Sequence, residues 1–570
     1  MPIPDLVRDS TFGNLVHYFS NGRLFQYADE RDDYVIPERY LPSTSIDFPR
    51  TLSSAPTLVA SPPPASPADV STLVSAPGIC AETGEKCSDL EKQVVSPHRR
   101  WRRRKSTAGS SSSKTTTLIA LSTNWSMRKK CFVGGLISLL TFAVYVGSAV
   151  YTSSIPGIMQ QFNVSQVTAT SGLTLFVAAY GIGPMLLSPM QELASWGRNP
   201  AYIIGLALFV IFQIPEILAK NIETVLIFRF LSGFVGSPAL ATGGASMADI
   251  FPPQHLAVAI GTWAIGAVLG PIVGPVIGGF AAQGMNWRWP FLELLWISAF
   301  AFVVLFFLFP ETYEDTILLR RAQRLRKLTG NPLLKAPSEV GQAADATIGS
   351  LLWENVTRAV RLSIEPAIFV ANAYIGLAYA LFYLWFEAFP LVFTEMHHFN
   401  LGLSGLPFLG FVVAAAITNH HIAGRYAKSP TGDLAPEVRL EIGLFAAPLI
   451  PISLFIFGWT SRPDVHWIWP IIEASLYLPG LFLAFQSILM YISISYPRYA
   501  ASLLAGNDFA RSVVASVFPL FGASMFKRLG LGGGSSLLAG LAILMIPGLW
   551  AIMHYGHRLR ARSQFTGFTH

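Results

Sequence analysis

Long apolar blocks follow one another along the chain from about residue 131 to about residue 555. Each block is close to twenty residues long and lacks the polar face that an amphipathic helix of a soluble core shows. A helix needs about 20 predominantly apolar residues to cross the roughly 30 Å of hydrocarbon in a bilayer. The pattern therefore predicts an all-α membrane protein in which each block is a transmembrane helix.

Twelve such blocks are present, in two groups of six that a polar stretch of about fifty residues separates. This plan is typical of transporters whose two halves rock about a binding site at the midplane. The predicted spans are 131–155, 168–190, 200–219, 224–248, 256–282, 289–309, 364–391, 402–424, 441–459, 466–494, 500–525 and 535–555. The predicted parts of the chain are a disordered tail (1–127), a first six-helix half (128–309), a cytosolic central loop (310–363), a second six-helix half (364–556) and a cytosolic C-terminal tail (557–570).

The tail before the first span is predicted to be mostly disordered. Residues 53–77 are rich in Ser, Pro and Ala, and residues 106–117 are largely a Ser/Thr run. Such compositions bury too little apolar surface to offset the entropy of ordering. Residues 8–18 could form a short amphipathic helix, but we expect that deleting residues 1–95 leaves folding and transport largely intact.

Composition and charge agree with a membrane location and orient the chain. Only 13% of the residues are charged, against about 25% in a typical soluble domain, and the mean hydropathy is +0.46. Lys and Arg gather before the first span and in the central loop, at 99–105, 128–130 and 320–327. Basic residues accumulate on the cytosolic side, so we predict cytosolic termini, in the cell membrane or alternatively the vacuolar membrane. The run 99–105 is interpreted as a contact with anionic lipid, with no nucleic-acid partner.

Motifs of enzymes and metal sites are missing from the sequence. The three cysteines, Cys80, Cys87 and Cys131, have no CxxC or matching His spacing, so we expect no metal site. No HExxH, GxSxG or Walker A string occurs, which argues against hydrolysis and against ATP as the energy source. We therefore expect a protein that is not an enzyme, with no catalytic residues and no cofactor.

The most specific pattern is Leu269-Gly-Pro-Ile-Val-Gly-Pro-Val-Ile-Gly-Gly279, inside the fifth span. Small residues recur every four positions, so one face of the helix is flat and a partner helix can approach closely. Membrane helices tolerate internal Gly and Pro where neighbouring groups satisfy the freed backbone. A bendable, closely packed helix suits alternating access. The candidate gating residues here are Gly270, Pro271, Gly274, Pro275, Gly278 and Gly279.

This string resembles the antiporter motif of the twelve-span drug:proton antiporters in the major facilitator superfamily. Further stretches resemble the fungal polyamine and multidrug resistance branch, and the resemblance covers about residues 128–562. These stretches are Arg229–Gly236, Asn286–Trp289, Pro310–Thr312, Arg320–Gly330, Pro436–Leu440 and Asn507–Arg511. The resemblance implies a proton-coupled antiporter that exports hydrophobic or cationic small molecules, drugs or toxins by alternating access.

Two alternatives to drug export stay open. One is a carrier of polyamines or of fungal secondary metabolites, and the other is a membrane receptor that does not transport. In each case the expected partners are a small molecule and the bilayer, with protons as the coupling ion of an antiporter. We expect the chain to act as a monomer.

The loop between the second and third spans departs from the superfamily pattern of an acid, two residues and then Gly-Arg. Here four residues separate Glu192 from Gly197 and Arg198. The longer spacing alters the usual contact between helices, so these three residues are gating candidates against the alternative of plain loop residues. One sequon on the predicted outer side, at Asn163, is a candidate glycosylation site.

Ionisable residues inside the spans are candidate functional groups, because inserting a charge at a helix centre costs about 2.5–3.5 kcal/mol. Arg229 matches the arginine to which the family's motif assigns a part in proton transfer. Glu387 and Glu473 have no basic neighbour at helical spacing, so we predict that one of them is the protonatable acid. Asp508 and Arg511 lie three apart on one helical face, which allows either a local salt bridge or a substrate contact.

Aromatic and polar residues of the second half are candidates for the substrate cavity. Aromatic rings suit flat or cationic ligands, although in membrane helices they also serve as packing. The residues assigned to the cavity are Tyr383, Tyr477, Asn507, Asp508 and Arg511.

Overall fold

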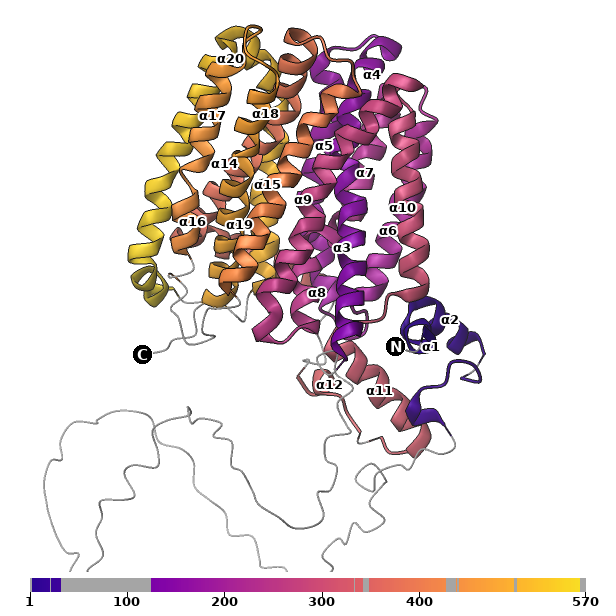
Figure 1. The fold of residues 1–570 in the computed structure, drawn as a ribbon. Coiled ribbons are helices and arrows are strands. Elements are labelled where there is room, and N and C mark those ends of the chain that lie inside the picture. The colour runs from indigo at the N-terminus through magenta and orange to yellow at the C-terminus, as the bar shows by residue number, and fades with distance from the viewer. Residues whose placement is uncertain are drawn as a thin grey trace, which may run out of the picture. The chain divides into compact units, whose positions relative to one another are not determined.

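The computed structural model describes residues 3–20, 22–31, 125–332, 334–341, 348–426, 437, 440–496 and 500–563. Within these residues the chain is helical and forms a bundle of helices that run side by side (Figure 1). The first half contains α3 (Met127–Val150), α4 (Ile155–Phe162), α5 (Gln166–Gln191), α6 (Arg198–Ile217), α7 (Ile222–Ala241), α8 (Gly243–Ile250), α9 (Pro253–Gly284) and α10 (Trp289–Leu308). A 3-10 turn, η5 (Tyr151–Ser154), joins α3 to α4.

The second half follows a helical connection. That connection, predicted as a loop, contains α11 (Glu314–Thr329), α12 (Pro337–Gly341) and α13 (Ile348–Ile364). The helices of the second half are α14 (Pro366–Phe389), α15 (Leu409–Tyr426), α16 (Leu440–Ala446), α17 (Leu449–Thr460), α18 (Ile468–Ser475), α19 (Tyr477–Ser495) and α20 (Ala500–Arg562). A π-helical turn, η6 (Pro390–Met396), extends α14, and a 3-10 turn, η7 (Leu403–Phe408), precedes α15.

The predicted twelve spans correspond to the helices observed. In the described part of the chain, ten helices are long and apolar enough to cross a membrane. One of them, α20, contains two predicted spans that meet at Gly530, whose φ of 72° is non-helical. Glycine adopts this left-handed conformation readily because it has no Cβ. The remaining predicted span, 402–424, is formed by η7 and the shorter helix α15.

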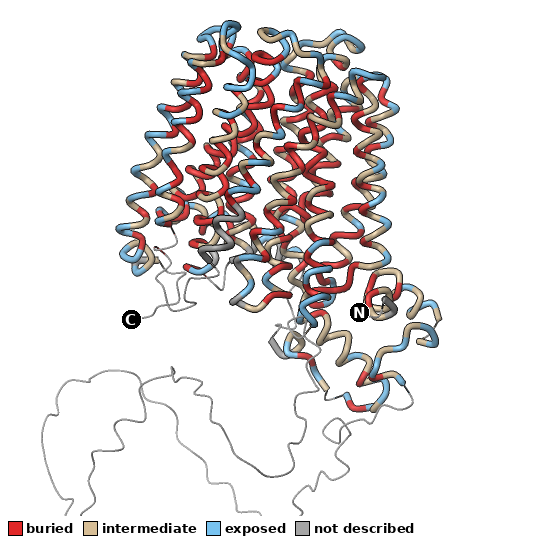
Figure 2. The backbone as a smooth tube through the Cα atoms, in the orientation of Figure 1, coloured by how far each residue is buried: buried red, intermediate tan, exposed pale blue. Residues whose placement is uncertain are grey.

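The bundle buries its interior and exposes residues around its perimeter (Figure 2). Many of these exposed residues are large and apolar. On α10 the exposed residues Trp296, Phe300, Val303 and Phe307 share one helical face. A soluble protein rarely exposes a contiguous apolar face of this kind, whereas a lipid-facing helix requires one. We call the end of the bundle where α3 begins and α20 ends the inner end, and the opposite end the outer end (Figure 1).

The prediction of a disordered tail over 1–127 is wrong for its first thirty or so residues. This segment forms α1 (Ile3–Asp9), α2 (Thr11–Phe19) and a 3-10 turn, η1 (Ala28–Glu30), and Leu6 is 5% exposed in the core of the first half. Ser10 caps α2 by accepting a hydrogen bond from the backbone N–H of Gly13. The amphipathic helix considered for residues 8–18 is therefore present as α2, while the composition of the longer tail favoured disorder. Residues 32–124 lie outside the described residues.

Deleting residues 1–31 is therefore expected to lower the amount of folded protein, contrary to the expectation from the sequence. The deletion exposes the surface that Leu6 covers, and burial of one leucine contributes about 1.5–3 kcal/mol. It also removes the ion pair between Asp9 and Lys129. Size-exclusion profiles of a fluorescent fusion would measure the loss. Deleting residues 52–95, whose composition cannot form a core, is the control, and equal peaks from both deletions would contradict the prediction.

Candidate functional site

A cavity lies between the two halves, about halfway along the bundle. It encloses about 620 Å³ of space, open solvent at its mouth included. Helices α3 and α9 form one wall, and α14, α19 and α20 form the other. The lining residues are Tyr145, Trp263, Ala264, Ala267, Val268, Pro271, Tyr379, Phe382, Leu478, Leu481, Phe482, Phe485 and Arg511.

Arg511 is the one charged residue among these described lining residues. Its Nη2 atom is paired with the Oδ1 atom of Asp508, so the local salt bridge allowed by their spacing forms. The same nitrogen donates to the hydroxyl of Tyr145 at 3.3 Å. The guanidinium lies 4.9 Å from the ring centroid of Tyr379 and 5.2 Å from that of Phe485. The cavity therefore offers aromatic surface and a neutralised donor group.

The predicted cavity residues are only partly brought together. Arg511 lines the cavity and Asp508 lies behind it as its partner. Tyr477 donates to the carbonyl oxygen of Ala378, and Asn507 donates to Asn372 over 2.7 Å, away from the cavity wall.

Tyr383 is also outside the wall, and its place is taken by Tyr379, one helical turn earlier. The assignment of Tyr383, Tyr477 and Asn507 to the wall does not hold in this structure. Sequence positions alone did not define which face of α14 or α19 points toward the other half.

A group of tyrosines joins the halves beside the cavity. The hydroxyl of Tyr180 on α5 is hydrogen-bonded to Tyr379 over 3.1 Å and to Tyr383 over 3.0 Å, both on α14. Tyr383 also donates to Ser148 of α3 over 3.2 Å. Rocking of one half against the other must break these bonds. Only Tyr383 of this group was a candidate from the sequence, because Tyr180 and Ser148 lie on other helices at no recognisable spacing from it.

The two halves are in close contact at the outer end. A Cβ atom on Gly279 of α9 would lie 2.7 Å from the carbonyl oxygen of Leu401, in the second half. A Cβ atom on Gly405 would lie 2.4 Å from the carbonyl oxygen of Pro275. Gln283 accepts a hydrogen bond of 2.8 Å from the backbone N–H of Gly402. We call this contact between α9 and the segment 401–405 the outer seal.

The other motif glycines serve a different contact. Cβ atoms on Gly270, Gly274 and Gly278 would lie 2.6 Å, 2.7 Å and 2.9 Å from atoms of α3, in the same half. Pro271 lines the cavity and the carbonyl of Pro275 belongs to the outer seal. The motif therefore has one face that packs within its own half and one that meets the other half.

The candidates in the loop between α5 and α6 form a charge network at the inner end. The Nε atom of Arg198 lies 2.5 Å from Oδ2 of Asp249. Glu311 accepts hydrogen bonds from the backbone N–H groups of Arg198 at 3.1 Å and Asn199 at 3.3 Å. Gly197 has a φ of 84°, and a Cβ there would lie 2.4 Å from Glu311, so only glycine fits without strain.

Glu192 does not replace Asp249 or Glu311 in this network. Among the described residues it has no side-chain hydrogen bond or ion pair. Burial raises the pKa of its carboxyl, and the nearby charge of Arg198 partly opposes that rise. The four-residue spacing moves the acid away from Arg198, and acids from α8 and from the end of α10 take the contact. Asp249 and Glu311 are the acids that contact Arg198, and the spacing within the loop did not identify them.

Arg229 is fully buried on α7, and its guanidinium is enclosed by aromatic rings. The guanidinium lies 4.7 Å from the ring centroid of Tyr151 and 4.2 Å from that of Phe176. Its Nε donates to the carbonyl oxygen of Gly172, while Nη1 and Nη2 have no hydrogen-bond partner among the described residues. A buried charge needs compensation, and Glu216 on α6 is an acid near enough to interact with the guanidinium electrostatically.

Glu216 is a buried acid that was not among the residues predicted to carry proton coupling, because its position is close to the end of its span. Its Oε1 accepts a hydrogen bond of 2.7 Å from Ser232, and its Oε2 has no partner among the described residues. Glu216 is the sole ionisable acid of the third predicted span, and Arg229 is the sole base of the fourth. That pairing of single opposite charges was the signal available in the sequence.

The two candidate proton acceptors have different surroundings. Glu387, 7% exposed on α14, accepts a long hydrogen bond of 3.4 Å from Gln166 of the first half. Glu473 is half-buried on α18 and accepts from Thr460 of its own half. Glu387 thus contacts the other half of the bundle, whereas the hydrogen bond of Glu473 is to a residue of its own half.

The candidate glycosylation site lies in a very short turn. Asn163 is the left-handed cap of α4, with a φ of 50°, and only residues 163–165 separate α4 from α5. Ser165, the third residue of the sequon, caps α5 by accepting from the N–H of Thr168. Glycosylation here stays a prediction.

Residues 137–519 match the family model described as Major Facilitator Superfamily. The chain belongs to the Major Facilitator Superfamily. It is therefore a multi-pass membrane transporter of small molecules and not an enzyme.

Relatives within the superfamily confirm the resemblance to fungal drug resistance transporters. The chain is 35% identical to the "Cycloheximide resistance protein" of Candida maltosa, over 98% of this chain and 99% of that protein. It is 40% identical to "Transporter mfs1" of Schizosaccharomyces pombe, over 78% of this chain and 86% of that protein. It is 39% identical to "Fluconazole resistance protein 1" of Saccharomyces cerevisiae, over 78% and 82%.

A solved transporter of the superfamily has the same fold. The structure described as the partially occluded inward open conformation of the xylose transporter XylE from E. coli superposes with a TM-score of 0.53. It covers 74% of this chain and 97% of that chain at 15% sequence identity. At this identity the likeness concerns the fold alone.

Asp508→Asn is expected to lower the amount of folded transporter, because it leaves the buried guanidinium of Arg511 without its charge partner. Breaking a buried pair by removing one member costs about 3–5 kcal/mol. The side chains of the pair are 3% and 6% exposed. Thermal unfolding in detergent would measure the loss, with Glu354→Gln as the control, since that ion pair with Arg358 is solvent-exposed. Equal thermal stability of the two variants would contradict the assignment.

Proposed function

We propose that this transporter is a proton-coupled antiporter that exports uncharged, aromatic, hydrophobic compounds from the cytosol. The observation that carries the proposal is the cavity between the halves, with aromatic walls and one arginine already neutralised by Asp508. Flat apolar compounds gain contact area on such walls, and an acceptor atom on the compound can meet the guanidinium of Arg511. The names of the relatives support export of toxic compounds.

Cationic substrates, and polyamines in particular, fit the cavity less well. No carboxylate is among its described lining residues, and Asp508 is already paired behind Arg511. A multiply charged amine would lose its hydrating water on entering the cavity and would find no carboxylate to compensate its charge. Such desolvation is costly in a low-dielectric site. The proposed substrate class is therefore narrower than hydrophobic or cationic compounds in general.

Proton coupling is proposed to use acids near the outer end. Glu387 lies between the halves and can change its surroundings when the outer seal opens. The buried pair of Glu216 and Arg229 is a second place where protonation and conformation can be linked. Glu473, in contact only with its own half, is the weaker of the two predicted acceptors.

Both termini are proposed to be cytosolic, with the chain in the cell membrane. Basic residues gather at the inner end, at the starts of α3 and α6, in α11 and at the end of α20. Basic residues accumulate on the cytosolic side of membrane proteins. Export then requires that the outer seal opens while the inner end closes.

A substrate panel tests the proposed substrate class. Inverted membrane vesicles that contain the transporter would take up labelled compounds after an imposed pH gradient. We expect uptake of uncharged aromatic compounds that carry a carbonyl or ring-nitrogen acceptor, and no uptake of spermidine. Uptake of spermidine without uptake of the aromatic compounds would favour the polyamine carrier instead.

A further inference from the structure

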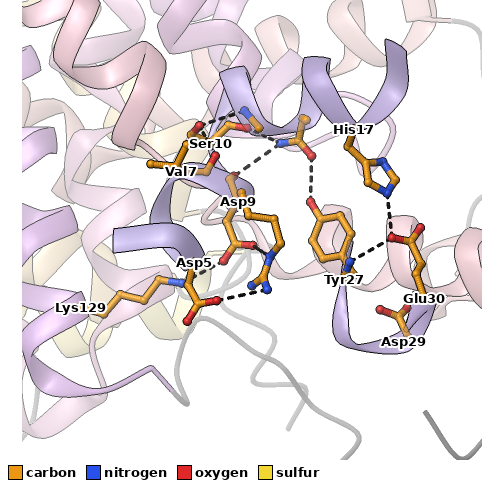
Figure 3. Close-up of polar contacts among 12 residues, drawn as sticks. Asp5, Val7, Asp9, Ser10, His17, Tyr27, Asp29, Glu30 and Lys129 are labelled. Atoms are coloured by element: carbon orange, nitrogen blue, oxygen red, sulfur yellow. Dashed lines mark hydrogen bonds and ion pairs between the residues drawn. The ribbon is translucent and has the colours of Figure 1, made fainter. Parts of the chain in front are cut away.

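The N-terminal segment 3–31 is held together by polar contacts on one side (Figure 3). The hydroxyl of Tyr27 donates to Asn14 over 2.9 Å, and the ring of His17 is 2.7 Å from Glu30. The same carboxylate accepts from the backbone N–H of Tyr27 at 3.0 Å. Asn14 and His17 of α2 thus point toward the rest of the segment.

Three polar contacts attach this segment to the inner end of the first half. Thr11 donates to Asn199 over 2.5 Å, directly beside Arg198 of the charge network. Lys129 at the start of α3 is 3.1 Å from Asp9, and Arg324 of α11 is 3.1 Å from Asp29. The attachment fixes the position of α2 relative to the neighbouring helix α10.

The opposite face of α2 is an apolar stripe. Phe12, Leu15 and Phe19 are spaced three and four residues apart, so they lie on one face of the helix. Phe12 packs on the last turn of α10, where its ring centroid is 4.8 Å from that of Phe307. Leu15 and Phe19 continue the stripe and are 43% and 79% exposed.

The stripe continues a surface that faces lipid. The exposed face of α10, which includes Phe300 and Val303, ends at Phe307, and Phe12 packs there. Helix α2 therefore lies beside the bundle, at the level where α10 ends (Figure 1). Exposed Tyr18 and Leu24 add to the apolar surface, and exposed Arg23 adds positive charge.

We propose that segment 3–31 is an interfacial anchor whose stripe of Leu15 and Phe19 inserts into the leaflet at the inner end of the bundle. The occupant of this face is the lipid interface, because the stripe is continuous with the lipid-facing surface of α10. Helices with an apolar face and a polar face lie in the interface plane, with the apolar face buried among headgroups and acyl chains. The segment thereby links the bilayer surface to the first turn of α6, which contains Arg198 and Asn199.

Spin-label accessibility in nanodiscs that hold one transporter each tests the anchor. Cysteine would replace Leu15, Phe19 or Phe300 in a full-length chain without native cysteines, with Gln26→Cys as the control because Gln26 is exposed and polar. Oxygen, which partitions into lipid, should relax the spins of the labels at 15 and 19. A water-soluble nickel chelate should not relax them. The label at 300, on the lipid-facing surface of α10, should give the same result. The label at 26 should show the reverse.

Two results would overturn the anchor. Relaxation of the labels at 15 and 19 by the nickel chelate, as strong as at 26, would place the stripe in water. Protection of both labels from both reagents would show that protein covers the stripe. Because Leu15 and Phe19 are tested separately, a folding defect in one variant leaves the other to decide. The result is independent of what the transporter exports.

Discussion

Replacing Gly405 by valine is expected to abolish transport while the protein remains in the membrane. A Cβ atom at Gly405 would lie 2.4 Å from the carbonyl oxygen of Pro275, a backbone atom that cannot move aside alone. The two halves therefore could not approach at the outer end, and the outer seal could not close. The expected result is a transporter held open to the outside, with export reduced to background.

The state of this variant can be measured directly with a thiol reagent that does not cross membranes. A cysteine at Ala267, in the cavity wall, should be modified from the outer side faster in Gly405→Val than in the parent. Gly284→Val is the matched control, because a Cβ at that end of α9 meets nothing within 4 Å. Normal export by Gly405→Val would show that the outer seal is not part of the transport cycle.

Replacing Gly270, Gly274 or Gly278 should act differently from replacing Gly405. These three glycines face α3 in the same half, so larger residues there disturb packing within that half. Overpacking of a well-packed contact typically costs about 1–3 kcal/mol. Their variants should lose thermal stability, whereas Gly405→Val should lose switching.

Glu387→Gln is expected to abolish export driven by a pH gradient at near-normal protein level. Glutamine keeps the size of the side chain and can still pair with Gln166, but it cannot take up or release a proton. Because Glu387 is buried between the halves, its access to protons depends on the conformational switch. Exchange of labelled for unlabelled substrate across the membrane, which needs no net proton movement, should persist.

Glu473→Gln provides the matched control for the coupling assay. Its carboxylate is half-buried and accepts from Thr460 within the same half, so its loss should leave the pH dependence unchanged. Wild-type pH dependence in Glu387→Gln would move proton coupling elsewhere. The buried pair of Glu216 and Arg229 would then be the next group to test.

The helices could be predicted from the sequence because the bilayer sets their length and their apolar character. The positions at which they meet could not. Tyr379 rather than Tyr383 lines the cavity, and the two differ by one helical turn on the same helix. The local pair of Asp508 and Arg511 was accessible from spacing, since both residues are on one helix face.

Contacts between segments far apart in the chain could not be predicted, because no spacing or motif in the sequence indicates them. Gly279 faces the carbonyl oxygen of Leu401, and a contact with a backbone atom cannot be predicted from the side chains of a sequence. Asp249 on α8 and Glu311 in the segment after α10 contact Arg198 from positions far along the chain. The order of the N-terminal segment likewise depends on Asn199 and Arg324, which only the folded bundle places beside it.

Proton movement on addition of substrate tests the proposed function most directly. Purified transporter would be placed in liposomes that contain a pH-sensitive dye, and an uncharged aromatic substrate would be added across an imposed pH gradient. We predict that substrate transport and dissipation of the gradient occur together, and that Glu387→Gln abolishes both. Substrate transport at the same rate with and without the gradient, and without any change in dye signal, would contradict proton antiport.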